Sequence, residues 1–310
     1  MSGLISKLRQ FSEHIKFLCL RAILMLFDVD DNENYAFPFD ILEKAPNLQG
    51  MAIVRCSNPR ILQQAQNSYI SEQEILEQLK ILTLHSVSKL QCIGLEEPLP
   101  KTVYEKLRCL NVIHCLDLTK LFHFPSVVSF SCLTHLRVEE CHQLEYLFTS
   151  SMATMLKNLG EIVVKDCRSI KKIVEEKEGT TTQVVEKEQE GTTSKEIKFE
   201  RLYLIHLDSL SNLECFYSGN DTLQLPALIQ VDIWQCPEME VFSRKEINAN
   251  SFRGIQASSN PLDELVFHND VNASVKRVFL LQVGTSTQSI NYELNFCMIF
   301  LSSNALDRLR

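Results

Sequence analysis

Residues 133–147 read LTHLRVEECHQLEYL, and residues 159–173 read LGEIVVKDCRSIKKI. Both segments follow the pattern L-x-x-L-x-L-x-x-C-x-x-L-x-x-L, and they match at every apolar position and at the cysteine. Self-similarity at a fixed period in this range indicates a repeat architecture. The chain is therefore expected to grow by stacking similar units, which also suits a length of 310 residues, more than one compact core usually spans.

Further copies of the pattern flank these two segments. Clear copies are Leu48, Met51, Ile53 and Cys56; Leu79, Leu82, Leu84, Val87 and Leu90; Leu107, Leu110, Val112, Cys115 and Leu118; and Leu228, Val231, Ile233, Cys236, Met239 and Phe242. Another copy is aligned as Phe199, Leu202, Leu204, Leu207, Leu210 and Leu213, with Leu207 in the cysteine position. Degenerate copies are expected at Leu20, Ile23 and Met25, and at Leu262, Leu265 and Phe267.

The spacing of the apolar residues predicts the architecture. The last two residues of L-x-x-L-x-L are two apart, as on one face of a β-strand. A single short strand cannot bury that face, whereas stacked repeats pair their strands and share one interior. We expect an α/β solenoid with a parallel β-sheet on its concave face and short helices or irregular turns on its convex face.

The cysteines are interpreted as structural. Cys56, Cys115, Cys141, Cys167 and Cys236 occupy one repeat position, so they stack one strand apart instead of converging on a metal ion. No Cys-x-x-Cys motif occurs. The adjacent pairs His114-Cys115 and Cys141-His142 invite a nucleophile hypothesis, but the repeat pattern points both thiols into the core. With no catalytic motif in the chain, we expect neither an enzyme nor a cofactor.

Charge and targeting signals limit the partners. The formal net charge is −8 and no basic block occurs, which argues against nucleic acid and anionic membranes. Residues 17–27 form an apolar run, but Arg21 interrupts it and no small-residue cleavage site follows. We therefore expect a cytoplasmic protein with reduced thiols.

Breaks in the pattern divide the chain. Residues 1–44 are expected to be an N-terminal cap or degenerate repeat, and residues 45–270 the repeat domain. Residues 175–196, EEKEGTTTQVVEKEQEGTTSKE, hold seven acidic and three basic residues and are expected to be a disordered acidic insertion. Residues 271–310 are expected to be an irregular tail, in which the apolar run 295–301 either caps the last repeat or forms an exposed edge.

Parts of the repeat region resemble the leucine-rich repeats of plant coiled-coil nucleotide-binding disease resistance proteins. The most specific are Phe216-Tyr-Ser-Gly-Asn220 and Cys236-Pro-Glu-Met-Glu-Val-Phe242. The resemblance implies a leucine-rich-repeat horseshoe that serves intracellular immune recognition. It implies a protein partner, namely a pathogen effector, a guarded host protein or a receptor nucleotide-binding domain. No P-loop motif occurs, so we expect the repeat region of such a receptor without its switch. A free-standing scaffold or adaptor outside immunity is the alternative.

Alternation along the strands predicts the binding surface. Side chains between the buried residues should line the concave sheet. The candidate protein-binding residues are His135, Arg137, Glu139, Glu161, Lys165, Arg201, Tyr203, Ile205, Asp232 and Trp234. Because exposed aromatic residues near arginine are typical of interface hot spots, we place the centre of the patch at Arg201, Tyr203 and Trp234. The alternative is that Trp234 packs on its neighbours in the sheet.

Overall fold

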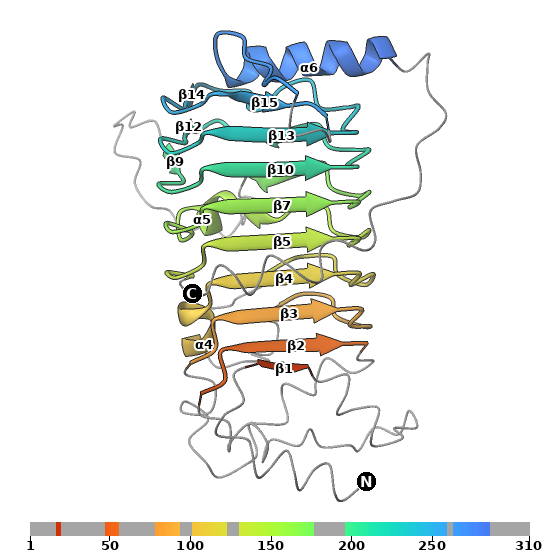
Figure 1. Ribbon diagram of the computed structural model, residues 1–310, viewed down its shortest axis with the longest axis vertical. Coiled ribbons are helices and arrows are strands. Elements are labelled where there is room, and N and C mark those ends of the chain that lie inside the picture. The colour runs from red at the N-terminus through yellow and green to blue at the C-terminus, as the bar shows by residue number, and fades with distance from the viewer. Residues whose placement is uncertain are drawn as a thin grey trace, which may run out of the picture.

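A ladder of parallel strands forms the body of the protein (Figure 1). The computed structural model describes residues 17–19, 47–55, 78–93, 101–122, 130–176, 196–258 and 263–285. Within these residues one nine-stranded sheet runs β1-β2-β3-β4-β5-β7-β10-β13-β15. Its strands are β1 (Phe17–Cys19), β2 (Gly50–Val54), β3 (Ile81–His85), β4 (Cys109–Ile113), β5 (His135–Glu139), β7 (Glu161–Lys165), β10 (Leu204–Asp208), β13 (Gln230–Trp234) and β15 (Gly254–Gln256).

The register of the ladder confirms the repeat. Leu136 of β5 pairs with Leu110 on one side and Ile162 on the other, and Val138 pairs with Val112 and Val164. All of these side chains are buried in one continuous core. Successive repeats thus bury the same two strand positions, as the apolar spacing predicted.

One copy of the repeat had been aligned three residues out of register. The structure pairs Ile205 with Ile162 and with Val231, and Ile205 is 0% exposed. Leu204, which had been placed in the core, is half-buried at the start of β10. Leu210 consequently takes the cysteine position that had been given to Leu207. The sequence LYLIHLDSL fits either alignment by hydrophobicity alone, because leucine or isoleucine recurs at too many of its positions.

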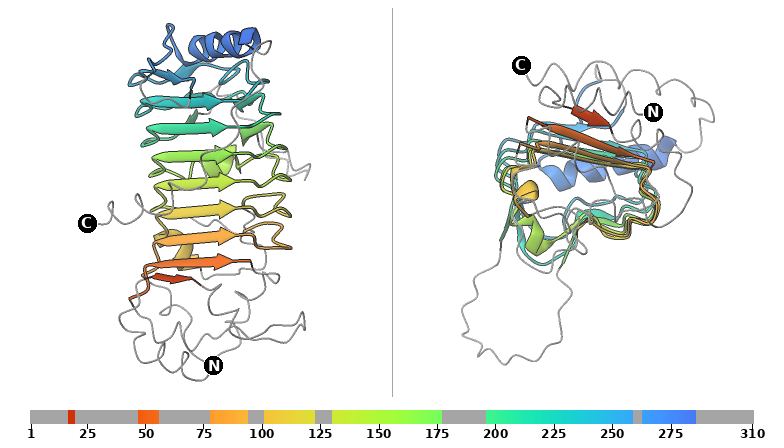
Figure 2. Two further views of the ribbon diagram at one scale, coloured as in Figure 1. Left: turned by 45° about the vertical axis from the view of Figure 1, so that its right-hand side comes forward. Right: turned by 90° about the horizontal axis from the view of Figure 1, so that it is seen from below.

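The side opposite the ladder contains short strands as well as a short helix (Figure 2). One three-stranded parallel sheet holds β6 (Phe148–Thr149), β8 (Lys172–Glu175) and β11 (Cys215–Tyr217), and another holds β9 (Glu196–Lys198), β12 (Thr222–Gln224) and β14 (Ile247–Asn248). Helix α5 (Ser150–Ala153) lies here, while α4 (Lys101–Lys106) lies at the edge where the strands of the ladder begin. Short helices were expected on this side, whereas these small sheets were not.

A sharp turn ends strands β2, β3, β4, β5, β7, β10 and β13. The residue after the strand has a positive φ, between 45° and 56°, at Arg55, Ser86, His114, Glu140, Asp166, Ser209 and Gln235. In all of these except Gln235, the backbone N–H donates to the carbonyl of the last strand residue of the next repeat, as from Glu140 to Lys165 at 3.0 Å. This left-handed residue turns the chain inward, so that the following side chain enters the core.

That inward position holds the predicted cysteines. Cys115, Cys141, Cys167 and Cys236 are buried, and each thiol donates to backbone carbonyls, as from Cys236 Sγ to Trp234 O at 3.2 Å. A small side chain with a weak donor satisfies carbonyls that the turn leaves inside. The structural role expected for these cysteines follows from this packing. Cys56 lies outside the described residues.

The two ends of the ladder differ from the middle. β1 pairs in parallel with β2, while the degenerate copy expected at Leu20, Ile23 and Met25 lies outside the described residues. At the other end, helix α6 (Val271–Thr285) packs over β15 (Figure 1), with Val271, Val275 and Val278 buried. The expectation of an irregular tail from residue 271 is therefore wrong for 271–285.

Some expectations fall on residues that the structure does not describe. These are the interior of the acidic insertion, residues 177–195, together with Leu262 and the apolar run 295–301. Their disorder, pairing or capping stays a prediction.

Candidate functional site

The exposed face of the nine-stranded sheet, called the sheet face below, carries the first, third and fifth residue of each five-residue strand. In β5 and β7 the burial alternates accordingly, with only the second and fourth residues fully buried. The following predicted residues lie on this face: His135, Arg137, Glu139, Glu161, Lys165, Asp232 and Trp234. The strand alternation was therefore sufficient to place them.

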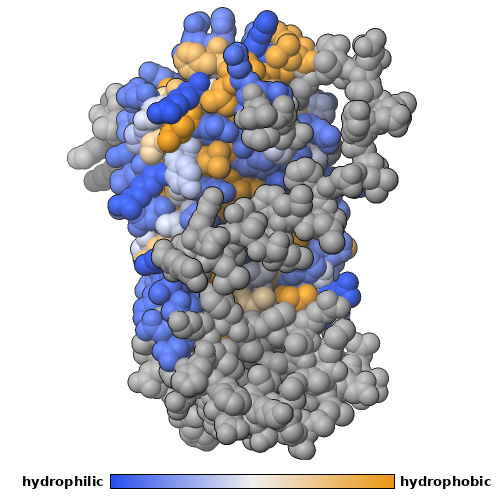
Figure 3. Space-filling view, viewed as in Figure 1, coloured by the Kyte–Doolittle hydropathy of each residue, from blue (hydrophilic) through white to orange (hydrophobic). Residues whose placement is uncertain are grey.

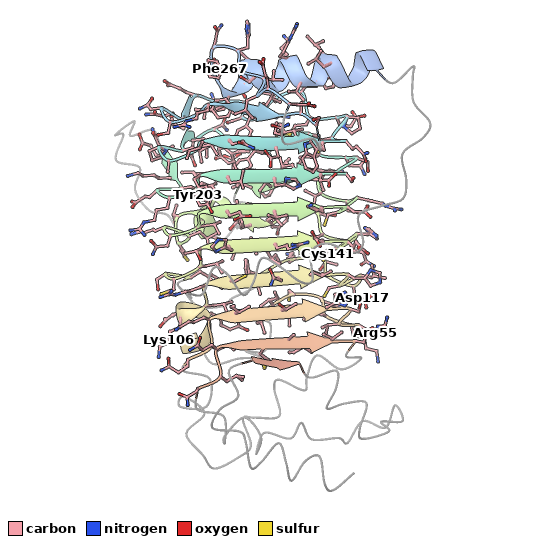
Figure 4. All side chains as sticks on the ribbon, viewed as in Figure 1. Arg55, Lys106, Asp117, Cys141, Tyr203 and Phe267 are labelled. Carbon is pink, nitrogen blue, oxygen red and sulfur yellow. The ribbon has the colours of Figure 1, made fainter. Side chains whose placement is uncertain are left out.

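The remaining three predicted residues lie elsewhere. Ile205 is a core residue, because the alignment of its repeat was wrong by three positions. Arg201 and Tyr203 precede β10 and are exposed at the edge where the strands start, where Tyr203 is labelled in Figure 4. Trp234 is instead the last residue of β13. At ~3.3 Å per residue, Tyr203 and Trp234 are separated by roughly 17 Å along the strands, so they do not form one patch.

The sheet-face residues of β10 are Leu204, His206 and Asp208, which sequence reasoning missed. Once Ile205 is aligned with Ile162 and Val231, the same alternation identifies them. Two of them are neighbours of Trp234: His206 contacts its ring, and Asp208 pairs with it on the adjacent strand. The sequence would have revealed these residues if this copy had been aligned with Leu210 in the cysteine position instead of Leu207.

Trp234 lies among charged and aromatic neighbours from two adjacent strands. The His206 ring meets the indole edge-on, with 4.5 Å between the ring centroids. The Lys165 ammonium lies 6.0 Å from the indole centroid, at the limit of a cation–π contact, and 4.0 Å from Asp208 Oδ2. Trp234 therefore packs on its sheet-face neighbours, the alternative considered from the sequence, and remains partly exposed.

Beside the indole, His206 and Asp232 form a nearly buried polar pair. His206 Nδ1 lies 3.0 Å from Asp232 Oδ2, and Gln230 Nε2 donates to Asp232 Oδ1 at 2.6 Å. The two residues are 8% and 9% exposed. Buried polar groups that are hydrogen-bonded to each other hold a fixed geometry, so this pair orients the ring on which Trp234 rests.

The part of the sheet face on β5 and β7 carries both signs of charge. Arg137 lies 2.7 Å from Glu139 Oε1, and His135 Nε2 lies 3.6 Å from Glu161 Oε2. These pairs balance one another, so this region is polar without a strong field of either sign. In Figure 3 the described surface of this view mixes hydrophilic and hydrophobic residues, with hydrophobic ones near α6 and others lower on the sheet face.

Several nitrogen atoms on the sheet face have no hydrogen-bond partner within the described part of the chain. They are Arg137 Nε, His206 Nε2 and Trp234 Nε1, each shielded from solvent. An unpaired buried donor costs ~1–3 kcal/mol. Arg137 Nε and Trp234 Nε1 are donors, whereas the role of His206 Nε2 depends on which ring nitrogen carries the proton.

The buried cysteines of the repeat are not activated thiols. Burial raises the pKa of the Cys236 thiol to about 12, and a hydrogen bond with Cys141, together with burial, raises the pKa of Cys115 as well. His114 Nδ1 lies 2.9 Å from Glu140 Oε2. The thiol of the next residue, Cys115, is buried in the core. Thiols held in the neutral form are poor nucleophiles and poor metal ligands.

Two further features are absent from the part of the chain that the structure describes. No group of three or more histidine, cysteine, aspartate or glutamate residues there is placed to hold a metal ion. No helix there has the length and apolar character needed to cross a bilayer.

Comparison with known families supports the repeat. Residues 123–247, which include strands β5, β7, β10 and β13, match the family model described as plant disease resistance protein RPS2-like, leucine-rich repeats. Over these residues the chain is similar to the leucine-rich repeats of plant disease resistance proteins. No curated protein matches the chain. The leucine-rich repeats explain the ladder register, the inward cysteines and the short strands on the far side within one repeating unit.

Proposed function

We propose that this leucine-rich-repeat region is a non-enzymatic binding and regulatory module of plant intracellular immune recognition, and that it holds a protein partner against the sheet face. The observation that carries the proposal is the environment of Trp234. A partly exposed indole rests on His206 and faces Lys165, and its shielded N–H has no acceptor among the described residues. Tryptophan beside cationic and hydrogen-bonding groups is the composition of interface hot spots.

The partner classes are those that the resemblance to resistance proteins implies. They are a pathogen effector, a guarded host protein and a receptor nucleotide-binding domain, each met in the cytoplasm. The balanced charges around Arg137 and Glu161 suit a folded protein surface with its own mixed charges. A scaffold outside immunity would use the same face, so partner identity distinguishes these two functions.

The test uses the fact that Trp234 is the one tryptophan in the sequence. The protein is labelled with 5-fluorotryptophan, and the single ¹⁹F resonance is followed while purified candidates are added, beginning with a nucleotide-binding domain from an RPS2-like resistance protein. A partner on the sheet face shifts or broadens the resonance. Lys165→Glu then weakens binding at least tenfold, while Lys171→Glu, exposed on the far side, leaves it unchanged.

The proposal is contradicted by a partner that binds tightly yet leaves the resonance in place and binds the Lys165→Glu variant equally well. A sheet-face partner that belongs to a process other than immunity would support the scaffold alternative.

A further inference from the structure

A second surface lies at the edge where the strands of the ladder begin. The residue just before each strand forms an unbroken backbone ladder of its own, in which each N–H donates to the carbonyl of the preceding member, as from Tyr203 to Gly160 at 2.9 Å and from Ile229 to Tyr203 at 2.9 Å. We call this set the start row; its members are Gln49, Lys80, Arg108, Thr134, Gly160, Tyr203, Ile229 and Arg253. It is separate from the Trp234 environment at the other end of the strands.

The middle of the start row is apolar and exposed. Tyr203 and Ile229 are each 38% exposed and are neighbours in the row. A Cβ placed on Gly160 would lie 2.8 Å from Tyr203 Cε1, so the tyrosine ring lies over a position that has no side chain. Its hydroxyl donates to Glu161 Oε2 at 3.4 Å. The ring is therefore held flat along the edge with one face towards solvent.

Unpaired cations flank this apolar centre. Within the described residues, Lys80, Arg108 and Arg253 of the start row form no ion pair, and neither does Arg201, two residues before Tyr203. At the opposite edge, Lys165 and Arg168 are both matched by carboxylates of the chain, while Arg55 forms no ion pair within the described residues. Two of the carboxylates near the start row, Glu161 and Glu200, already face His135 and Lys198. The start row thus has cations left for an external anion, although the whole chain is acidic.

We propose that the start row binds an acidic segment of another protein, with carboxylates at its ends and an apolar or aromatic residue at its centre. Arginine pairs with carboxylates in a two-bonded geometry. Arg253 follows Ile229 in the start row, and Arg201 lies two residues before Tyr203 in the same repeat. Five strand spacings of ~4.8 Å separate Arg108 from Arg253, or about 24 Å. An extended segment of roughly seven residues at ~3.3 Å each covers that distance.

A defined polymer probe tests this surface without a known partner. The full chain is titrated into a fluorescein-labelled random copolymer of glutamate and tyrosine, with polyglutamate and polylysine for comparison, and binding is read by fluorescence anisotropy in 50 mM salt. We expect the glutamate–tyrosine copolymer to bind best and polylysine not to bind. Arg201→Glu with Arg253→Glu should weaken copolymer binding at least tenfold. Tyr203→Ser with Ile229→Ser should remove the preference over polyglutamate.

A charge-matched control separates this site from general electrostatics. Arg55→Glu with Arg168→Glu makes the same charge change at the opposite edge and should leave the affinity within twofold of the parent. The ¹⁹F resonance of Trp234 should not move when the copolymer binds, which distinguishes this surface from the proposed sheet-face site. The inference is overturned if the copolymer does not bind in 50 mM salt, if both charge variants weaken it equally, or if only the Trp234 resonance responds.

Discussion

His206 and Asp232 lie side by side on strands β10 and β13, with the imidazole Nδ1 3.0 Å from the carboxylate Oδ2. They are the third residues of their strands, so the repeat itself brings them together. The same His206 ring meets Trp234 at 4.5 Å. The pair consequently links the stability of the sheet to the geometry of the proposed binding surface.

Breaking this pair should destabilise the fold. Removing one partner leaves the other nearly buried and unpaired, so Asp232→Ala should lower the free energy of unfolding by ~1–3 kcal/mol. His206→Ala should cost a similar amount, and the double variant should cost less than the sum by ~1 kcal/mol, because the interaction is lost only once. Urea denaturation of the two single variants and the double variant measures this coupling.

A matched control exists in the same row of the sheet. Asn111 Nδ2 donates to Thr83 Oγ1 at 3.0 Å across strands β3 and β4, in a less buried setting. Thr83→Ala should cost only ~0.5–1.5 kcal/mol. Strictly additive effects at His206 and Asp232 would show that the two side chains do not interact.

The thiols should differ sharply in reactivity. At pH 8 a pKa of about 12 for Cys236 leaves only about one thiolate in ten thousand, and the side chain is also buried. We expect a thiol reagent such as iodoacetamide to label the exposed Cys132 quickly and Cys236 only after unfolding. Peptide mapping by mass spectrometry reads both sites. Fast labelling of Cys236 in the folded protein would place its repeat turn outside the core.

The left-handed residue after a strand predicts how substitutions there rank in free energy of unfolding. Gln235 has a φ of 47°, a left-handed conformation that asparagine tolerates and β-branched residues resist. Gln235→Asn should match or slightly exceed the parent in free energy of unfolding, whereas Gln235→Val should lose about 1–2 kcal/mol. Thermal and urea denaturation measure the difference.

The Gln235 side chain also accepts a hydrogen bond from Ser209 Oγ at 3.0 Å. Ser209→Ala removes that bond without changing the backbone requirement, so it serves as the control and should have a small effect. Equal stability of the valine and asparagine variants would contradict a left-handed backbone at this position.

Much of the fold was predictable because the repeats constrain one another. Leu136 and Ile162 occupy matching places in two well-formed copies of the repeat. The positions of the strands, the buried residues and the turns could therefore be predicted together. The copy around Leu204 and Ile205 failed because its cysteine position holds a leucine, and neighbouring leucines allowed a second alignment. That error placed Ile205 on the surface.

The candidate site was predictable only in part, for two physical reasons. Strand alternation specifies which face a residue such as Lys165 or Trp234 occupies, but not which partner a side chain from another strand meets. The His206–Asp232 pair depends on the alignment of two copies 26 residues apart. The small sheets opposite the ladder were missed because their strands, such as β6 with two residues, are too short to show a period.

The central claim is that Ile205, rather than Leu204, belongs to the shared interior of one parallel ladder. Urea denaturation of Leu204→Asp and Ile205→Asp tests it most directly. A carboxylate on the sheet face meets water, so Leu204→Asp should remain folded and lose under ~1 kcal/mol. A carboxylate in the core is unpaired, so Ile205→Asp should lose more than ~4 kcal/mol or fail to fold. The opposite ranking would contradict the ladder and the binding surface built on it.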